Sequence, residues 1–405
     1  MKLKQLKYPL AVILACLLLF TASCSKPTGE AEDGSKWTNR DTWLTSGTAS
    51  EQGYYYLQED HFLSFFDFAS QKSVCLCDKT GCTHRDSDCR AYMLFATPTR
   101  MFFYNDSLYF FEARQDGLKL TRRDADGGNY EEVLTLMEGK QEAETTLDLA
   151  DYRVCGNLVY YVGSVLKNPG DGWLEGISYL YQIDLDAGKE KLLCEIGEDG
   201  GALVAVRKGQ VLLQQNLEKP AQEFGEDYNS EEYLSSFPHR VLMWEENTGE
   251  LTTLLEDNRW NLLGALAAWD DSYYVIRWDE THETNYVERR SFDGSETETV
   301  FSPGCKISNY SIPSDNLLSL ILEGTRKGLS IPNFEETNFS FLSEGDNILY
   351  AAKEGYIVQR VLEYEGDLDA TASVTKTALS YLSFEDAEAG RKNFVDFYIQ
   401  EYDSL

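Results

Sequence analysis

The sequence predicts an all-β fold, a single β-propeller of four-stranded antiparallel blades. We expect seven blades, with six or eight as the neighbouring counts. Apolar and aromatic runs alternate with tight polar turns along almost the whole chain, which is typical of short antiparallel strands. Two kinds of turn also alternate at a spacing of roughly 45–60 residues, which gives four strands per unit. Two β-sandwiches are the alternative, but they would not require this alternation.

The first kind of turn carries glycine or another small residue between two strands. It occurs at 67–70, 124–128, 184–188, 246–249 and 292–295. The second kind precedes it in most units, at 105–106, 156–157, 208–209, 270–271 and 345–346, and the unit near 315–316 is degenerate. A four-stranded sheet cannot bury both faces alone, so neighbouring units must stack around an axis.

The first unit shows only three strands, at 54–57, 62–68 and 74–77. A closed propeller leaves no open sheet edge between its first and last blades. We therefore expect a C-terminal strand within 393–402 to supply the missing innermost strand and to close the ring. Residues 383–390 predict a short helix just before it.

The N-terminus predicts a lipoprotein signal peptide over residues 1–23. Three lysines precede an apolar run at 9–20, which is too short to span a bilayer. Cys24 follows small residues and resembles the modified cysteine of a lipobox, so we expect diacylglycerol and an acyl chain on it. This places the protein at the extracytoplasmic face of the cell membrane. An ordinary secreted protein is the alternative, and Cys16 is a rival lipid attachment site.

Three segments follow from this reading: a signal peptide at 1–23, a flexible tether at 24–50, and a propeller at 51–405. The tether prediction depends on a composition dominated by small and charged residues. Residues 1–23 contain three lysines and no acid, so removing them changes the formal net charge from −32 to −35. So acidic a chain should repel phosphate backbones, which argues against nucleic-acid binding.

One constellation has metal-ligand chemistry, and it lies in a loop at 75–92. Cys77, Cys82, His84 and Cys89 are spaced as C-x4-C-x-H-x4-C, and a closed Cys3His set predicts one structural zinc. Disulfides are the alternative outside the cell, and free thiols are a third outcome. Cys24 apart, the mature chain has an odd seven cysteines, and a Cys3His site would leave an even four.

The same segment resembles one in propeller surface lipoproteins of Gram-positive anaerobes. These proteins carry Leu-Cys-x4-Cys-x-His-x4/5-Cys-x-Ala-Tyr near the mature N-terminus, and residues 76–92 are similar to it. Residues 382–386 with Asn393 and Phe394 weakly resemble the C-terminal segment of the family. The resemblance implies a propeller and a surface location, and it implies no activity. Cys75 is an additional cysteine relative to the pattern.

Long loops between second and third strands are expected at 164–177, 216–240 and 279–285, on the face that also carries the connections between blades. The aromatic residues of this candidate ligand face are Trp173, Tyr228, Tyr233, Trp278 and Tyr286. No nucleophile elbow, zinc-protease motif or phosphate loop occurs. We therefore expect a binding or sensing module for a glycan, peptide or envelope protein. A carboxylate-dependent glycan-cleaving enzyme and a structural subunit of an envelope complex are the alternatives.

Overall fold

The computed structural model confirms the fold class, an all-β propeller of seven four-stranded antiparallel blades. Everything below concerns one compact unit, Gly34–Leu405. The described residues are 34–40, 47–58, 61–94, 96, 100–140, 145–167, 175–198, 200–217, 238–258, 261–323, 325–337, 339–343, 345–365 and 373–402. The predicted signal peptide and Cys24 lie outside them. Within these ranges, no helix has the length and apolar character needed to cross a membrane.

The blades are numbered in chain order, and each is made of four consecutive strands. Blades 1 to 3 contain β1 (Gly47–Ala49), β2 (Gly53–Leu57), β3 (Leu63–Asp67), β4 (Lys72–Cys75), β5 (Met101–Tyr104), β6 (Ser107–Arg114), β7 (Gly117–Asp124), β8 (Glu131–Leu136), β9 (Thr145–Cys155), β10 (Leu158–Lys167), β11 (Glu175–Asp184) and β12 (Lys189–Gly197). Blades 4 and 5 contain β13 (Ala202–Arg207), β14 (Gln210–Asn216), β15 (Pro238–Glu245), β16 (Glu250–Asn258), β17 (Leu262–Trp269), β18 (Ser272–Asp279), β19 (Thr284–Ser291) and β20 (Thr297–Phe301). Blades 6 and 7 contain β21 (Ile307–Ser314), β22 (Leu317–Leu322), β23 (Thr325–Ser330), β24 (Glu336–Thr337), β25 (Asn347–Ala351), β26 (Gly355–Glu365), β27 (Ser373–Ser383) and β28 (Val395–Glu401).

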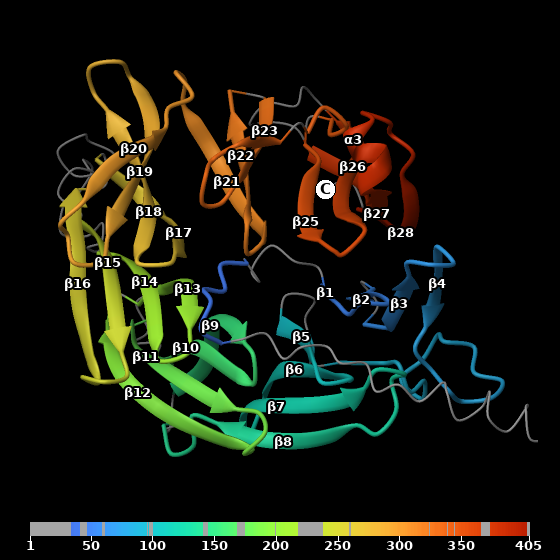
Figure 1. Cartoon of the computed structure of the whole chain (residues 1–405). Helices are drawn as coiled ribbons and strands as arrows, with labels where there is room; N and C mark the ends of the chain where they lie inside the picture. Colours follow the sequence, from blue (N-terminus) through green and yellow to red (C-terminus); the bar gives the residue numbers. More distant parts are fainter. Residues whose placement is uncertain are drawn as a thin grey trace, which may run out of the picture. The chain divides into compact units, whose positions relative to one another are not determined.

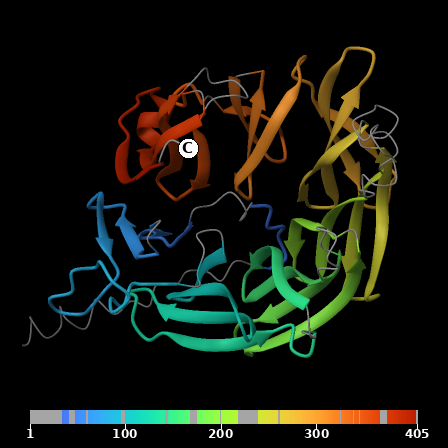
Figure 2. The same ribbon diagram turned by 180° about the vertical axis from the view of Figure 1, so that it is seen from behind.

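The blades follow one another around a ring, with the first strand of each blade innermost (Figure 1). The same order is seen from behind in Figure 2. Antiparallel alternation places the turns between first and second strands at one end of every blade. The connections between second and third strands, and those between blades, lie at the other end. We call these ends the turn face and the loop face.

The hydrophobic core consists of separate layers, each packed between two consecutive blades, and we call each such interface a seam. Alternating side chains of one strand serve two seams, because successive residues of a strand point to opposite faces of the sheet. In β6, Leu108 and Phe110 pack toward blade 1, whereas Tyr109 and Phe111 pack toward blade 3. A layer of this kind is present at each seam among the described residues, and one joins blade 7 to blade 1.

The predicted exchange of a C-terminal strand into blade 1 is wrong. Strand β28 pairs with β27 and is the outermost strand of blade 7. The innermost strand of blade 1 is β1, whose three residues pair with β2. The ring therefore closes by side-chain packing at the seam between blades 7 and 1, without a shared sheet. The expected short helix is present as α3 (Phe384–Glu388), with Ser383 as its N-cap.

The segment 24–50, expected as a flexible tether, includes residues 34–40 and 47–50 that the structure describes. Besides β1, residues 34–40 lie along the turn face as a docked segment, which we call the strap. Thr38 pairs with Val206 of blade 4 through two backbone hydrogen bonds of 2.7 and 3.0 Å. The indole N–H of Trp37 donates to the carbonyl of Asp270 in blade 5. Docking buries Trp37, which is 5% exposed, so this segment behaves as part of the core.

Asn39 ties the strap to the next two blades and is fully buried. Its side-chain amide donates to the Ala268 carbonyl at 2.9 Å and accepts from the Ala268 N–H at 2.8 Å. The amide also donates to the carbonyl of Asp315 in blade 6. Arg40 then donates to the Tyr350 hydroxyl of blade 7 at 2.7 Å. The Gly34 carbonyl also accepts from the Cys155 thiol of blade 3 at 3.7 Å. The strap therefore contacts five consecutive blades before the chain continues to β1.

The turns of the first kind are confirmed in blades 1 to 5. Residues 345–346 are expected as a turn of the second kind, between the first and second strands of a blade. In the structure they precede β25 and belong to the connection from blade 6 to blade 7. The first turn of blade 7 lies at 352–354, and the degenerate pair at 315–316 is the first turn of blade 6. The expected turn at 345–346 is therefore wrong by one strand.

Candidate functional site

The Cys/His loop connects β4 of blade 1 to β5 of blade 2, on the loop face. The ligand atoms of Cys77, Cys82, His84 and Cys89 all lie within 4.8 Å of one another. A tetrahedral zinc with ordinary bond lengths separates its ligand atoms by about 3.5–3.8 Å, so small side-chain rotations would complete the geometry. The cluster can therefore hold a metal ion such as zinc.

Backbone hydrogen bonds to one residue, Leu63, hold both ends of this loop. The Leu63 N–H donates to the Ala91 carbonyl, and the Leu63 carbonyl accepts from the Leu76 N–H, each at 2.9 Å. The Met93 N–H donates to the His61 carbonyl at the same distance. Between these anchors the chain turns tightly, with Gly81 and His84 in the left-handed region at φ 76° and 54°. The ligand positions are therefore fixed to the start of β3.

The cluster packs against the seam between blades 1 and 2. Cys89 is 3% exposed and belongs to the core layer of that seam, and Cys77 and Cys82 pack partly buried against it. The His84 Nδ1 atom lies 3.3 Å from the Cys89 sulfur. Cys89 is buried and the other three candidate ligands are partly exposed. A closed set of four protein ligands is typical of a structural metal site, since no position remains for substrate.

The thiols differ in their ease of ionisation. Burial acts to raise the pKa of Cys77, but the backbone N–H groups of Lys79 and Arg90 and the neighbouring thiols outweigh it and lower this pKa to about 6. Burial raises the pKa of Cys89. Metal binding requires thiolates, so Cys77 is the ligand most ready for it.

None of the seven described cysteines forms a disulfide. Cys75, the additional cysteine next to the motif, is not part of the four-ligand group. Cys155, Cys194 and Cys305 lie in blade 3 or after blade 5, away from the motif in sequence. The arrangement therefore favours the metal-binding interpretation over disulfides within the loop.

Of the predicted ligand face, Trp278 and Tyr286 lie within the described residues, and Trp173, Tyr228 and Tyr233 lie outside them. Trp278 and Tyr286 flank the loop between β18 and β19, as expected. Tyr286 is the cross-strand partner of Arg277, so Trp278 and Tyr286 point to opposite faces of the blade. They therefore do not form one stacking surface.

A cavity of about 420 Å³ lies in the central channel. Its walls come mostly from the innermost strands of blades 3 to 6, with Gln214 from β14, the second strand of blade 4, and Asn39 of the strap contributes to it from the turn-face end. The lining residues used below are Asp151, Arg153, Ala202, Gln214, Tyr310 and Ile312. Neither Trp278 nor Tyr286 lines it. We call this cavity the channel pocket.

The charged groups of the channel pocket neutralise each other. Arg153 donates to an Asp151 carboxylate oxygen at 2.7 Å, and both side chains are less than 10% exposed. Asp151 also accepts from the Leu203 N–H, and Arg153 donates to the Leu203 carbonyl. The pair therefore joins the inner strands of blades 3 and 4 and adds no net charge to the pocket.

The sequence interpretation missed the channel pocket and its residues. One signal was available: Asp151 and Arg153 are two residues apart in an apolar strand, so both point to the same face of it. Asn39 offered no such signal, because its partners are more than 200 residues away in sequence.

No protein-family model matches this chain, and a search of curated proteins found no match. Among solved structures it is similar to an oligogalacturonate lyase in complex with manganese, with 10% identity, 85% of this chain and 86% of that chain covered, and a TM-score of 0.48. It is also similar to TolB from Acinetobacter baumannii, with 11% identity, 84% and 77% covered, and a TM-score of 0.38.

A third similar structure is the β-propeller domain of the Trilobed protease from Pyrococcus furiosus, which is described as having an open velcro topology. The identity is 9%, 84% of this chain and 89% of that chain are covered, and the TM-score is 0.41. At such low identity these likenesses concern the fold alone.

Proposed function

We propose that this chain is a lipid-anchored propeller at the extracytoplasmic face of the cell membrane, where it binds a small neutral polar ligand in the channel pocket. The observation that carries this proposal is the pocket itself, which has a size typical of small-molecule sites. Most of its residues come from strands of several blades, which are rigid elements of the fold.

The chemistry of the lining favours a neutral ligand. Asp151 and Arg153 form an ion pair with each other at 2.7 Å, and the other described side chains of the lining are uncharged. Gln214 and the Tyr310 hydroxyl supply hydrogen-bonding groups beside apolar residues such as Ile312. A glycan or peptide fragment without net charge fits this mixture.

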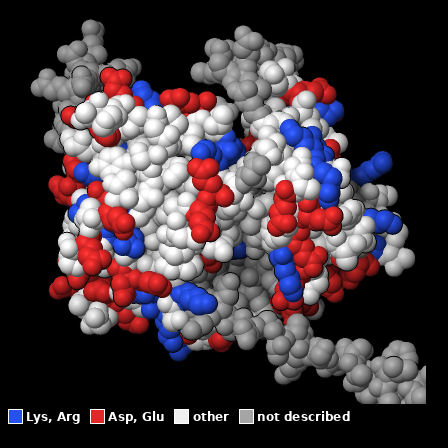
Figure 3. Space-filling view, turned by 45° about the horizontal axis from the view of Figure 1, so that its top comes forward, with Lys and Arg blue, Asp and Glu red and all other residues white. Residues whose placement is uncertain are grey.

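Charge on the outer surface is consistent with this class of ligand. Figure 3 shows acidic residues in several separate groups, with basic residues interspersed among them. The formal net charge of −32 disfavours polyanionic partners such as nucleic acids.

A glycan-cleaving reaction requires two carboxylic acids about 5–10 Å apart around the sugar. Among the described residues that line the channel pocket, Asp151 is the single carboxylate, and it is paired with Arg153. The pocket therefore supports binding better than hydrolysis.

The test is a thermal-shift panel of uncharged mono- and disaccharides and dipeptides on purified residues 25–405. Ala202 lines the pocket and is exposed, so Ala202→Trp would fill the space. Ala187, exposed in a distant turn, gives the matched control Ala187→Trp. We expect a stabilising compound whose effect is lost in A202W and kept in A187W. A shift that persists in A202W would contradict the assignment to this pocket.

The lipid anchor has a separate test. Cys24→Ala should move the full-length protein from the membrane fraction to the soluble fraction in the producing bacterium. Mass spectrometry of the native N-terminus should find Cys24 as the first residue, carrying diacylglycerol and an acyl chain. Retention of C24A in the membrane would contradict the anchor at this position.

We also propose that the Cys/His loop holds one structural zinc ion. Cys77, Cys82, His84 and Cys89 would be its ligands, and the ion would supply a cross-link between the ends of the loop. Metal analysis of protein prepared without reductant should find about one zinc per chain. His84→Ala should lose it, whereas His282→Ala, at an exposed turn of blade 5, should keep it. Few free thiols and no zinc in the wild type would contradict this site.

A further inference from the structure

Arg123 is a buried cation next to the Cys/His loop. It lies in β7 of blade 2 and is 8% exposed. Its Nη1 atom donates to the carbonyl of Arg90, the residue that follows the ligand Cys89, and to the Gly127 carbonyl at 2.9 Å. Blade 2 therefore reaches the metal loop through this side chain.

Within the part of the chain that the structure describes, the other contacts of the Arg123 guanidinium do not bring an opposite charge to it. Its Cζ atom lies 4.9 Å from the centre of the Tyr130 ring. The Arg123 Nε atom is buried and has no hydrogen-bond partner among the described residues. Burial lowers the pKa of Arg123, and nearby Tyr130, Glu112 and the sulfurs of Cys89 and Cys77 act in the opposite direction. The thiol cluster is therefore within electrostatic reach.

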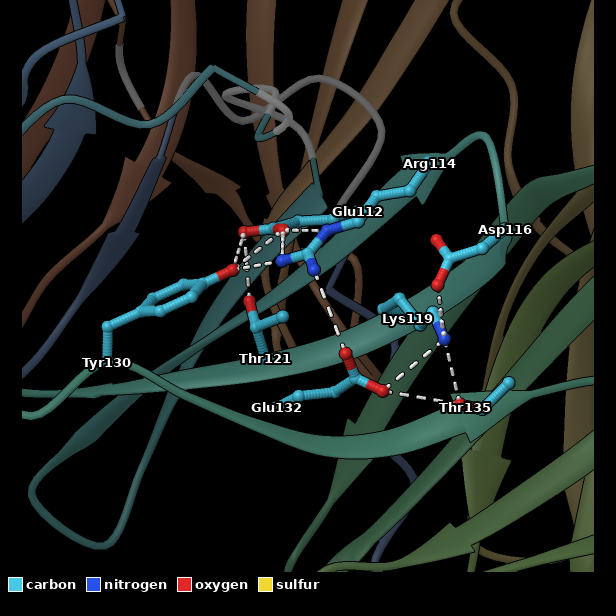
Figure 4. A network of polar contacts seen from close by, with 8 residues as sticks. All are labelled: Glu112, Arg114, Asp116, Lys119, Thr121, Tyr130, Glu132 and Thr135. Atoms are coloured by element: carbon cyan, nitrogen blue, oxygen red, sulfur yellow. Dashed lines mark hydrogen bonds and ion pairs between the residues drawn. The ribbon is translucent and has the colours of Figure 1, made fainter. Parts of the chain in front are cut away.

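The buried carboxylate that acts on Arg123, Glu112, is already paired. Glu112 accepts hydrogen bonds from Arg114, from the Thr121 hydroxyl at 3.0 Å, and from the Tyr130 hydroxyl at 2.9 Å (Figure 4). The Arg114–Glu112 ion pair measures 2.5 Å, and only 3% of the Glu112 side chain is exposed. This network fixes the position of Tyr130 under Arg123, while its negative charge is balanced by Arg114.

A Cys3His zinc centre carries one net negative charge, because three thiolates exceed the charge of a divalent ion by one and the imidazole is neutral. A buried charge is costly unless an opposite charge lies nearby. We propose that Arg123 is a positioning residue that supplies the buried counter-charge of this metal centre. The inference rests on the proposed zinc site.

The test compares zinc affinity, measured by competition with a chromophoric chelator, in three variants of residues 25–405. Arg123→Met removes the charge and keeps much of the volume, and Arg123→Lys keeps the charge. Arg122→Met is the matched control, since Arg122 is the half-exposed neighbour that pairs with Glu131. The melting temperature of each metal-free variant reports on folding.

We expect R123M to bind zinc about 10- to 100-fold more weakly than the wild type, as is usual for residues around a metal site. R123K should recover most of the affinity, and R122M should equal the wild type. Wild-type affinity in R123M would overturn the inference and leave the zinc site standing. Equal losses in R123M and R123K would also overturn it, since the charge would then be irrelevant. A wild-type protein without zinc would overturn the inference together with the proposed site.

Discussion

The two seams of blade 1 differ in what holds them together. Toward blade 2, the contact is a mixture of aliphatic side chains and rings, with Tyr55 stacked on Phe103 at 5.5 Å, and the Cys/His loop packs against it, fastened to Leu63 by backbone hydrogen bonds. Toward blade 7, aromatic rings dominate: Phe66 stacks on Phe397 with ring centres 4.4 Å apart, and Phe68 stacks on Tyr381 at 5.4 Å. One seam has a candidate metal cross-link, and the other has a cluster of rings.

The difference follows from the size of blade 1. Its strands have three, five, five and four residues, whereas those of blade 3 have eleven, ten, ten and nine. Shorter strands bury less apolar area, and the hydrophobic contribution scales with that area. A small blade at the closure point of a ring therefore depends on other contacts: the metal loop on one side, and large rings on the other.

Removal of the metal should have the largest effect and should be confined to one seam. Because zinc binding is coupled to the folding of its loop, chelation should cost several kcal/mol of stability locally. Hydrogen exchange should show lost protection at Leu63, Leu76 and Met93, with little change at Phe397. Equal loss of protection at both seams would break the comparison, because the two sides of blade 1 would then be coupled.

Phe66→Ala tests the aromatic seam. Phe66 is fully buried, so its truncation should cost about 3–5 kcal/mol in the free energy of unfolding, measured by urea denaturation. Phe111→Ala, equally buried at the seam between blades 2 and 3, is the matched control for total stability. Only F66A should increase hydrogen exchange in both β2 and β27. The same exchange pattern in F111A would mean that the closure seam has no special role.

Asn39→Ala tests the strap. Its loss leaves the Ala268 N–H and two backbone carbonyls without their side-chain partner, which should cost about 3 kcal/mol in total. Asn39→Asp cannot donate to the carbonyls and should behave similarly. Unchanged urea midpoints in both variants would show that the strap adds nothing to ring stability.

A pH series on Asp257→Asn gives the smallest effect, at an ordinary seam. Burial acts to raise the pKa of Asp257, but hydrogen bonds from Asn258, Asn261 and Arg277 lower it below 3.8. A lowered folded-state pKa means that the carboxylate stabilises the protein above pH 3.8, and that this contribution fades as the pH falls further. D257N should therefore be about 1 kcal/mol less stable at pH 7 and about equal to the wild type near pH 2.

The control for D257N is Asp271→Asn, because the Asp271 side chain is 97% exposed. D271N should leave the free energy of unfolding unchanged across the pH series. The metal seam should behave differently from the Asp257 link. Protons compete with zinc for the thiolates, so its stability should fall at a higher pH. If the metal seam and the Asp257 seam lost stability over the same pH range, the distinction between them would be removed.

The repeat could be predicted from sequence because each blade encodes its own turns and alternating strands. Strand β1 could not, because three residues within a polar segment carry no periodic signal. Its omission left blade 1 one strand short, and the C-terminal strand was then assigned to fill the gap. Both errors have one cause: strand pairing across the ring depends on partners that local patterns do not specify.

The candidate site also has one part that the sequence could predict and another that it could not. The four metal ligands lie within thirteen residues, so their spacing alone could predict the cluster. The channel pocket combines Asn39 with inner strands of four blades, and only the closed ring brings these residues together. Arg123 likewise lies in a different blade from the loop that it contacts.

The strap also constrains the order in which the ring can assemble. Asn39 is separated by 229 residues from Ala268 and by 276 from Asp315. Closing so long a stretch of chain costs entropy before any contact can compensate, and such contacts form late in folding. The strap is synthesised before every blade, yet it can complete its contacts only after blade 7 is made, because Arg40 donates to Tyr350 of that blade.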